Sequence, residues 1–124
     1  MAPASSEGRQ RKVVNGYGDG GFRISGDRIE GSVIVFPERF VAWPVASAAA
    51  IDAAALAPLI EAAGQIDILL LGCGDGPPVF DPALRGLLRE HGIALDAMDT
   101  GAACRTYNIL LTESRAVAAA LIAV

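Results

Sequence analysis

The chain has 124 residues, of which 52% are hydrophobic and 19% charged, with a formal net charge of −4 and a sequence pI of about 4.8. A chain of this length is normally one domain and buries about 65% of the surface that its unfolded form exposes, so it folds around a core. The acidic balance excludes a general attraction to nucleic acid, and no segment reaches the roughly 20 apolar residues of a membrane span.

The first twelve residues, MAPASSEGRQRK, are polar and are predicted to be a disordered leader before one α/β domain at 13–124. The leader lacks the apolar core of a secretory signal, which predicts a cytoplasmic protein in a reducing compartment. Two cysteines, Cys73 and Cys104, lie 31 positions apart. In such a compartment we expect both to be free thiols.

The residues from 13 to about 45 have the pattern of antiparallel strands. Short runs with β-branched and aromatic side chains alternate with Gly, Asp and Pro. Asp19-Gly20 and Gly26-Asp27 supply the turn residues that such strands need. The expected strands are VVNGY, FRIS, RIEGSVIVF and RFVAWPV.

The second half of the chain changes to helical periodicity. Residues 52–63 place Leu56, Leu59 and Ile60 on one stripe, which predicts a helix that Gly64 ends. The next run, IDILLLG at 66–72, is apolar almost without interruption, which is typical of a strand buried on both faces.

A second helix is predicted to begin at Pro82 with Asp81 as its N-cap and to end at His91-Gly92. The run IALDAMD at 93–99 is another strand, a helix fits 100–112, and a last strand begins at Arg115 or Ala116. Strands alternating with helices indicate an α/β fold. We expect a compact three-layer domain, in which an antiparallel β subdomain precedes β-α-β-α-β units around a mixed central sheet.

If strands 66–72 and 93–99 are parallel, the turns that follow them lie at the same edge of the sheet. Open α/β sheets keep their ligand crevices at this edge. The sequence therefore predicts a binding crevice between the two turns. Its candidate residues are Gly72, Cys73, Gly74, Asp75, Asp99, Thr100, Cys104, Arg105 and Asn108.

The run LLLGCGDG resembles the glycine-rich loop with which S-adenosylmethionine-dependent methyltransferases approach their ligand. Asp96 or Asp99 would supply the carboxylate that binds ribose. Pro77 and Pro78 oppose this interpretation, because a helix that starts after them cannot point its first N–H groups at the loop. S-adenosylmethionine or a nucleotide at the crevice stays an alternative.

Asp99-Thr100-Gly101 is also the tripeptide of aspartic proteases, but one helix and one strand after it are too few for the surrounding barrel. Asp99 or Thr100 is more simply a helix N-cap. Cys104 lies near the first turn of the same helix and beside Arg105, and both features stabilise a thiolate. A reactive thiol is therefore a second alternative. The pattern predicts no cofactor and no metal cluster.

Four separated blocks of the sequence carry a resemblance to a known family: Gly16 to Ile24, Glu30 to Ser32, Leu71 to Gly74 and Met98 to Asn108. In this order they look like the domain-of-unknown-function family that includes mitochondrial complex I (NADH dehydrogenase) assembly factor 3 and its bacterial and archaeal relatives. The resemblance implies a three-layer α/β fold with an additional β layer and no established catalytic residues. Ser114 stands where the resemblance implies a helix-ending glycine, and Cys73 where it implies threonine or another small residue.

The resemblance favours a non-enzymatic protein-binding or assembly factor linked to the biogenesis of respiratory complex I. Its partners would be proteins, including subunits of a membrane complex, and the hypothesis allows peripheral association with a membrane. The alternative is a small-molecule-binding protein or enzyme that uses the crevice formed by the turns 72–76 and 99–105.

Overall fold

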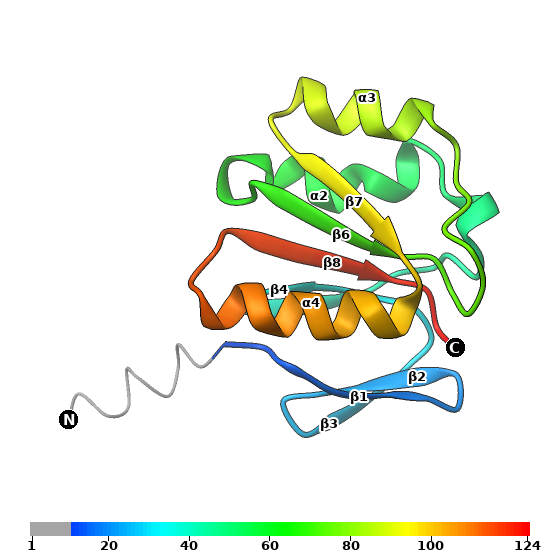
Figure 1. Cartoon of the computed structure of the whole chain (residues 1–124), viewed down its shortest axis with the longest axis vertical. Coiled ribbons are helices and arrows are strands. Elements are labelled where there is room, and N and C mark those ends of the chain that lie inside the picture. The colour runs from blue at the N-terminus through cyan, green and yellow to red at the C-terminus, as the bar shows by residue number, and fades with distance from the viewer. Residues whose placement is uncertain (1–10) are drawn as a thin grey trace.

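The computed structural model describes residues 11–124, and its first elements form a small antiparallel sheet (Figure 1). The strands are paired in the order β1-β2-β3, with β1 at Val14–Gly18, β2 at Gly21–Ile24 and β3 at Asp27–Glu30. Asp19 and Gly20 join β1 to β2 with φ of 54° and 78°, the type I′ geometry whose twist suits a hairpin. The second turn is Ser25-Gly26, one residue earlier than predicted, because Asp27 already pairs with Ile24.

The central sheet has five strands in the order β5-β4-β8-β6-β7. Its β8 runs antiparallel to β4 and parallel to β6, so the sheet is mixed, as predicted. The predicted run RIEGSVIVF divides between the two sheets at Gly31, whose φ is 83°. The bounds are β4 Val33–Phe36, β5 Arg39–Ala42, β6 Ile68–Gly72, β7 Ala94–Met98 and β8 Val117–Leu121.

The prediction of one helix over 52–63 is wrong. The chain instead forms the short 3₁₀ turns η1 (Ala48–Ala50) and η2 (Ala54–Leu56), the α-helix α2 (Ala57–Glu61) and the 3₁₀ turn η3 (Ala63–Gln65). Pro58 stands in the first turn of α2. It has no N–H to donate to the preceding turn, so a continuous helix through it would lack a hydrogen bond.

The two later helices lie where the sequence predicted them. Helix α3 (Ala83–Glu90) follows Asp81, whose Oδ1 accepts a hydrogen bond from the Ala83 N–H at 2.9 Å. Helix α4 (Thr100–Thr112) begins after Asp99, whose Oδ1 accepts from the Ala102 N–H at 2.8 Å. In each case the carboxylate satisfies a first-turn N–H that has no partner within the helix.

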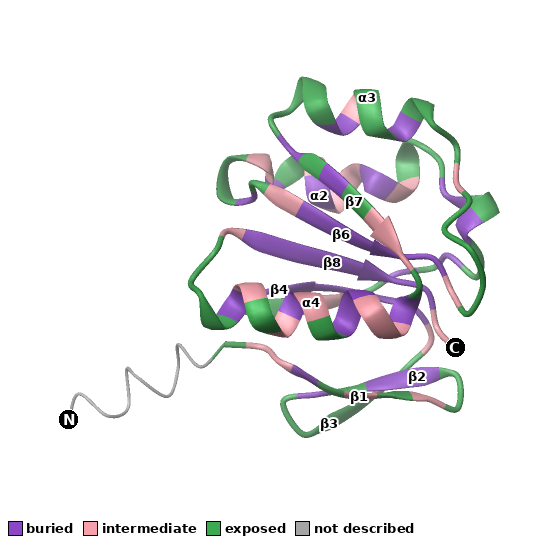
Figure 2. Ribbon diagram, viewed as in Figure 1, coloured by how far each residue is buried: buried purple, intermediate pink, exposed green. Residues whose placement is uncertain are grey.

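The five-stranded sheet separates two hydrophobic cores. Helices α2 and α3 cover one face, while α4 and the three-stranded sheet cover the other (Figure 1). Along β8, Val117, Ala119 and Leu121 belong to the α4 side and Ala118 and Ala120 to the other. All five are buried, and Figure 2 shows β8 buried along its length. This two-sided burial confirms the three-layer α/β fold.

Most of the predicted leader lies outside the described residues. Its last two residues, Arg11 and Lys12, are described. The Lys12 N–H donates to the Pro37 carbonyl at 2.8 Å, and Arg11 Nη1 donates to the Leu111 carbonyl at 3.0 Å. These bonds attach the start of the described chain to the β4–β5 turn and to the end of α4. Within residues 11–124, no helix has the length and apolar character that crossing a membrane requires.

Candidate functional site

The turns after β6 and β7 lie side by side, as the topology predicted. The two strands are parallel, with Gly72 opposite Met98. Beyond their ends, the Cys73 N–H donates to the Met98 carbonyl at 2.8 Å, and the Thr100 N–H donates to the Gly74 carbonyl at 2.9 Å. We call this region, residues 72–74 together with 99–101, the exit edge.

Thr100 occupies the space between the two turns. Its side chain is fully buried, and its Oγ1 donates to the Ile122 carbonyl at 2.8 Å and accepts from the Gly74 N–H at 2.9 Å. A Cβ added at Gly72 would lie 2.9 Å from the Thr100 Cα. The two turns are therefore bonded directly to each other, and the Thr100 side chain lies between them.

Tyr17 covers the outer side of the exit edge. A Cβ added at Gly101 would lie 2.6 Å from the Tyr17 Oη, so only glycine leaves room for the ring at this turn of α4. Arg105 Nη1 donates to the same Oη at 3.1 Å. Asp75 and Asp99 are exposed beside these residues. The strand pattern around Tyr17 gave no signal of this contact.

Asn108 lies away from the predicted crevice and has a structural role. Its Oδ1 accepts from the Val14 N–H at 2.9 Å, and its Nδ2 donates to the Val14 carbonyl at 2.8 Å. Gly101, Arg105 and Asn108 therefore form an i, i+4, i+7 stripe along α4 that holds strand β1. This spacing was a signal available in the sequence, because such residues share one face of a helix.

Cys104 does not have the surroundings of a reactive thiol. It is 2% exposed, and burial raises its pKa to about 12, although the neighbouring Arg105 acts to lower it. Desolvation outweighs the nearby charge because the thiolate would have to form inside the α4 core. Burial also raises the pKa of the Cys73 thiol. Both cysteines are free, as expected, and their burial does not favour the reactive-thiol alternative.

The other two motif interpretations also lack their structural context. The first helix after the glycine-rich run begins at Ala83, beyond Pro77 and Pro78, so its N-terminus does not cradle that loop. Asp99 accepts a hydrogen bond from the Ala102 N–H, which is the helix N-cap role that the sequence favoured over the protease tripeptide. Within residues 11–124, no group of three or more His, Cys, Asp or Glu side chains could hold a metal ion.

A buried hydroxyl lies in the middle of α4. Tyr107 is fully buried, and its Oη has no hydrogen-bond partner within residues 11–124. Burial raises the pKa of this phenol, and the charge of Arg11 opposes the shift. The hydroxyl therefore stays protonated and lacks the hydrogen bond that a buried polar group normally makes.

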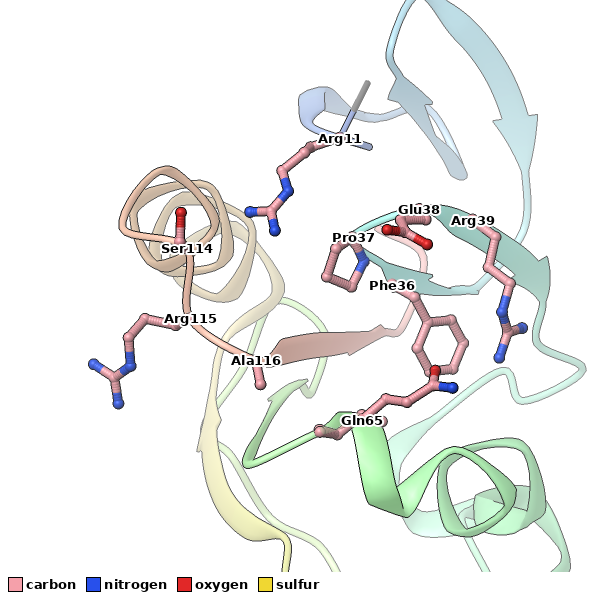
Figure 3. A pocket seen from close by; sticks show the side chains of 10 residues that line it. Arg11, Phe36, Pro37, Glu38, Arg39, Gln65, Ser114, Arg115 and Ala116 are labelled. Atoms are coloured by element: carbon pink, nitrogen blue, oxygen red, sulfur yellow. The ribbon is translucent and has the colours of Figure 1, made fainter. Parts of the chain in front are cut away.

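A cavity of about 370 Å³ lies at the opposite end of the parallel strands, before β6 and β8 begin (Figure 3). None of the predicted site residues lines it. We call it the basic pocket, because three of its residues are arginines. Its lining consists of Arg11, Phe36, Pro37, Glu38, Arg39, Gln65, Ile66, Ser114, Arg115 and Ala116.

A second cavity of about 340 Å³ lies beside the edge strand β7. Arg85 and Arg89 of α3 line it together with residues 92–95. Arg85 Nη1 donates to the Leu95 carbonyl, so this arginine already binds an edge group of the sheet.

Comparison with known proteins gives related sequences from animals and bacteria. The chain is 36% identical over 109 residues to NADH dehydrogenase [ubiquinone] 1 alpha subcomplex assembly factor 3 of Xenopus tropicalis, which covers 88% of this chain and 60% of that protein. It thus spans about three fifths of the length of this relative. It is also 36% identical to an uncharacterized protein of Rhodobacter capsulatus, with 98% of this chain and 93% of that protein covered.

A solved structure supports the same relationship. The crystal structure of a Bartonella henselae protein, described as an outer membrane protein, matches with a TM-score of 0.86 and 37% identity over 93% of this chain and 97% of that one. Residues 14–122 match the family described as protein of unknown function DUF498/DUF598. With this match over nearly the whole described chain, the protein belongs to the DUF498/DUF598 family, the one that the sequence blocks resembled.

Proposed function

We propose that this protein is a non-enzymatic protein-binding factor that assists the assembly of respiratory complex I. The observation that carries the proposal is its 36% identity, over 88% of the chain, to a protein named as an assembly factor of NADH dehydrogenase. Its partners would be subunits of that complex or other assembly proteins. The activity would belong to surfaces of the folded domain and not to a catalytic centre.

The arrangement of the exit edge supports binding in preference to chemistry there. Thr100 fills the space between the turns, and Cys104 is held in a core that disfavours its thiolate. Large apolar side chains that face solvent include Tyr17 at the exit edge, which is 45% exposed, and Val79 in the segment between β6 and α3, which is 72% exposed. Exposed apolar side chains of this size are available to a protein partner.

We also propose that the protein works in the cytoplasm, with access to the membrane surface where such a complex is built. Its two free and buried cysteines fit a reducing compartment, because a pair of thiols in an oxidising one tends to be bridged.

The test is deletion of the gene in the organism that encodes the protein. We expect less assembled complex I in membranes, measured on native gels and as NADH:quinone activity, with other respiratory complexes unchanged. Re-expression of the wild-type chain restores both measurements. Unchanged complex I in the deletion strain would contradict the proposal.

A further inference from the structure

We propose that the basic pocket docks an acidic segment of a protein partner, in which carboxylates flank an apolar residue. The inference rests on the proposed function and assigns its docking surface. Four observations carry it: the uncompensated charge of the pocket, the contacts that hold its arginines, its apolar floor, and its position away from the exit edge.

The pocket concentrates positive charge in an acidic chain. Its lining contains Arg11, Arg39 and Arg115 against Glu38 alone, while the whole chain has a formal net charge of −4. Across residues 11–124, the ion pair between Arg28 and Glu30 is the only one within 4.0 Å. In the described part of the chain, the pocket arginines therefore have no carboxylate partner. Such clusters attract groups of opposite charge and steer their approach.

Neutral contacts hold two of the arginines in place. Arg11 Nη1 donates to the Leu111 carbonyl at the end of α4, and this uses one of the five N–H donors of the guanidinium. The Arg39 Cζ lies 4.0 Å from the centre of the Phe36 ring. Both contacts fix the side chains without neutralising their charge. An incoming carboxylate therefore meets groups whose motion is already restricted, which lowers the entropy cost of binding.

The floor between these cations is apolar. Figure 3 shows Phe36 and Pro37 between Arg11 on one side and Arg39 on the other, with Ala116 nearby. Arg115 points away from Phe36 and Pro37 (Figure 3). Because Arg11 and Arg39 lie on opposite sides of Phe36 and Pro37 (Figure 3), we expect each arginine to meet a separate carboxylate of one ligand. An extended peptide places an apolar side chain on the floor and an acidic one near each cation.

The size of the pocket agrees with a short segment. Its volume of about 370 Å³ falls at the lower end of the range of about 300–1,000 Å³ typical of ligand pockets. It lies beside the amino ends of β6 and β8, on the β4–β5 turn and the α4–β8 connection. A partner bound here leaves the exit edge and Tyr17 uncovered.

The test is a titration of the full chain with the peptide acetyl-Glu-Asp-Leu-Phe-Asp-Glu-amide, followed by amide NMR shifts and fluorescence anisotropy. We expect the shifts to fall on residues 36–39 and 114–116. The double variant Arg11→Glu and Arg39→Glu should weaken binding by about tenfold or more, because the acidic side chains of the peptide then meet like charges. Raising the salt concentration should also weaken it.

Matched controls separate this site from a general charge effect. The double variant Arg23→Glu and Arg89→Glu changes the net charge by the same amount outside the pocket, and we expect it to bind within about twofold of wild type. The peptide acetyl-Gln-Asn-Leu-Phe-Asn-Gln-amide keeps the apolar centre and should not bind. Equal weakening by both double variants, or equal binding of both peptides, would overturn the proposal.

A membrane is the competing occupant. If phosphatidylcholine vesicles with about one third phosphatidylserine bind through Arg11 and Arg39 while the acidic peptide does not, the peptide site is refuted. Failure of this docking proposal can be told apart from failure of the proposed assembly function, because the gene deletion tests only the latter. The docking proposal alone is refuted if the acidic peptide does not bind and the pocket variant fully restores complex I in the deletion strain. The proposed assembly function then still holds. The assembly function alone is refuted if the peptide binds but the deletion strain has an unchanged amount of complex I.

Discussion

The two ends of the parallel strands β6 and β8 differ in how the connecting segments use the space beyond the sheet. At the exit edge, Thr100 bonds to both Gly74 and Ile122 and closes the gap. At the other end, the connections leave a pocket of about 370 Å³ whose charged residues are mostly arginines. The rule for open α/β sheets describes which turns are neighbours. Whether a cleft lies between them depends on the side chains that the turns carry.

The exit edge is a place where the backbone approaches itself closely, and the basic pocket is a place where it does not. Gly72 and Gly101 allow that approach, because a Cβ at either would fall within 3.0 Å of a neighbouring atom. The pocket is lined instead by larger side chains from four separate segments. The following experiments test this contrast, beginning with the largest expected effect.

Thiol labelling tests how tightly the core around the first half of α4 is packed. With a pKa near 12 in place of 9.0, the thiolate fraction of Cys104 at about pH 8 falls by about 10³-fold. We therefore expect reaction with a disulfide reagent to be slower than for an unfolded-chain thiol by at least that factor. The comparison is the same chain in concentrated guanidinium chloride, and Cys104→Ala identifies the signal. Native-state labelling at the unfolded rate would show that the core opens freely.

Thr100→Val opens the exit edge with little change of shape. It leaves the Gly74 N–H and the Ile122 carbonyl without their partner, and we expect the free energy of unfolding to fall by about 3 kcal/mol. Denaturant unfolding measures this. The control is Thr112→Val, whose exposed hydroxyl donates to the Asn108 carbonyl and whose loss should cost about 0.5 kcal/mol or less. Equal effects of the two changes would argue that the exit edge is not closed by Thr100.

Ser114→Gly changes a residue at the other end of the parallel strands, beside the basic pocket, and we expect it to raise stability instead of lowering it. Ser114 follows α4 with φ of 60°, in the left-handed conformation that glycine adopts without strain. We expect a gain in unfolding free energy of about 1 kcal/mol. Ser47→Gly is the control, because Ser47 has an extended φ of −150° and glycine gains nothing there. A loss of stability in Ser114→Gly would show that the serine side chain makes a contact of its own.

Tyr107→Phe tests the core beneath helix α4, which runs between the exit edge and the basic pocket. Its Oη is buried without a partner in the described part of the chain, so removal of the hydroxyl should raise the unfolding free energy by about 0.5–1 kcal/mol. Tyr17→Phe removes a hydroxyl that accepts from Arg105 in a residue that is 45% exposed, and it should shift stability by less. Destabilisation by Tyr107→Phe would point to a bound water or another partner at this hydroxyl.

The sequence predicted those parts of the fold that depend on local signals. Asp99 is a strong N-cap, and helix α4 occupies 100–112 as expected. The apolar run before Gly72 became the buried parallel strand β6. The helix over 52–63 failed because Pro58 interrupts a pattern that is otherwise helical.

The candidate site was predictable only in part, for a physical reason. Neighbouring turns follow from parallel strands, but the burial of Thr100 and Cys104 depends on packing that no spacing rule describes. The basic pocket was missed because its arginines, at positions 11, 39 and 115, come from distant segments and form no motif. Local patterns in the sequence do not reveal an assembly of residues so far apart along the chain.

The position of β8 has a consequence for how the protein is made. Val117–Leu121 lies between β4 and β6, which have no contact with each other as sheet neighbours. On the ribosome, residues 33–36 and 68–72 emerge well before the strand that joins them. The apolar β6 therefore waits with an unpaired edge until synthesis reaches residue 121, and such an edge is open to association with other chains. The central sheet can therefore be completed only late in synthesis, after β8 has left the ribosome.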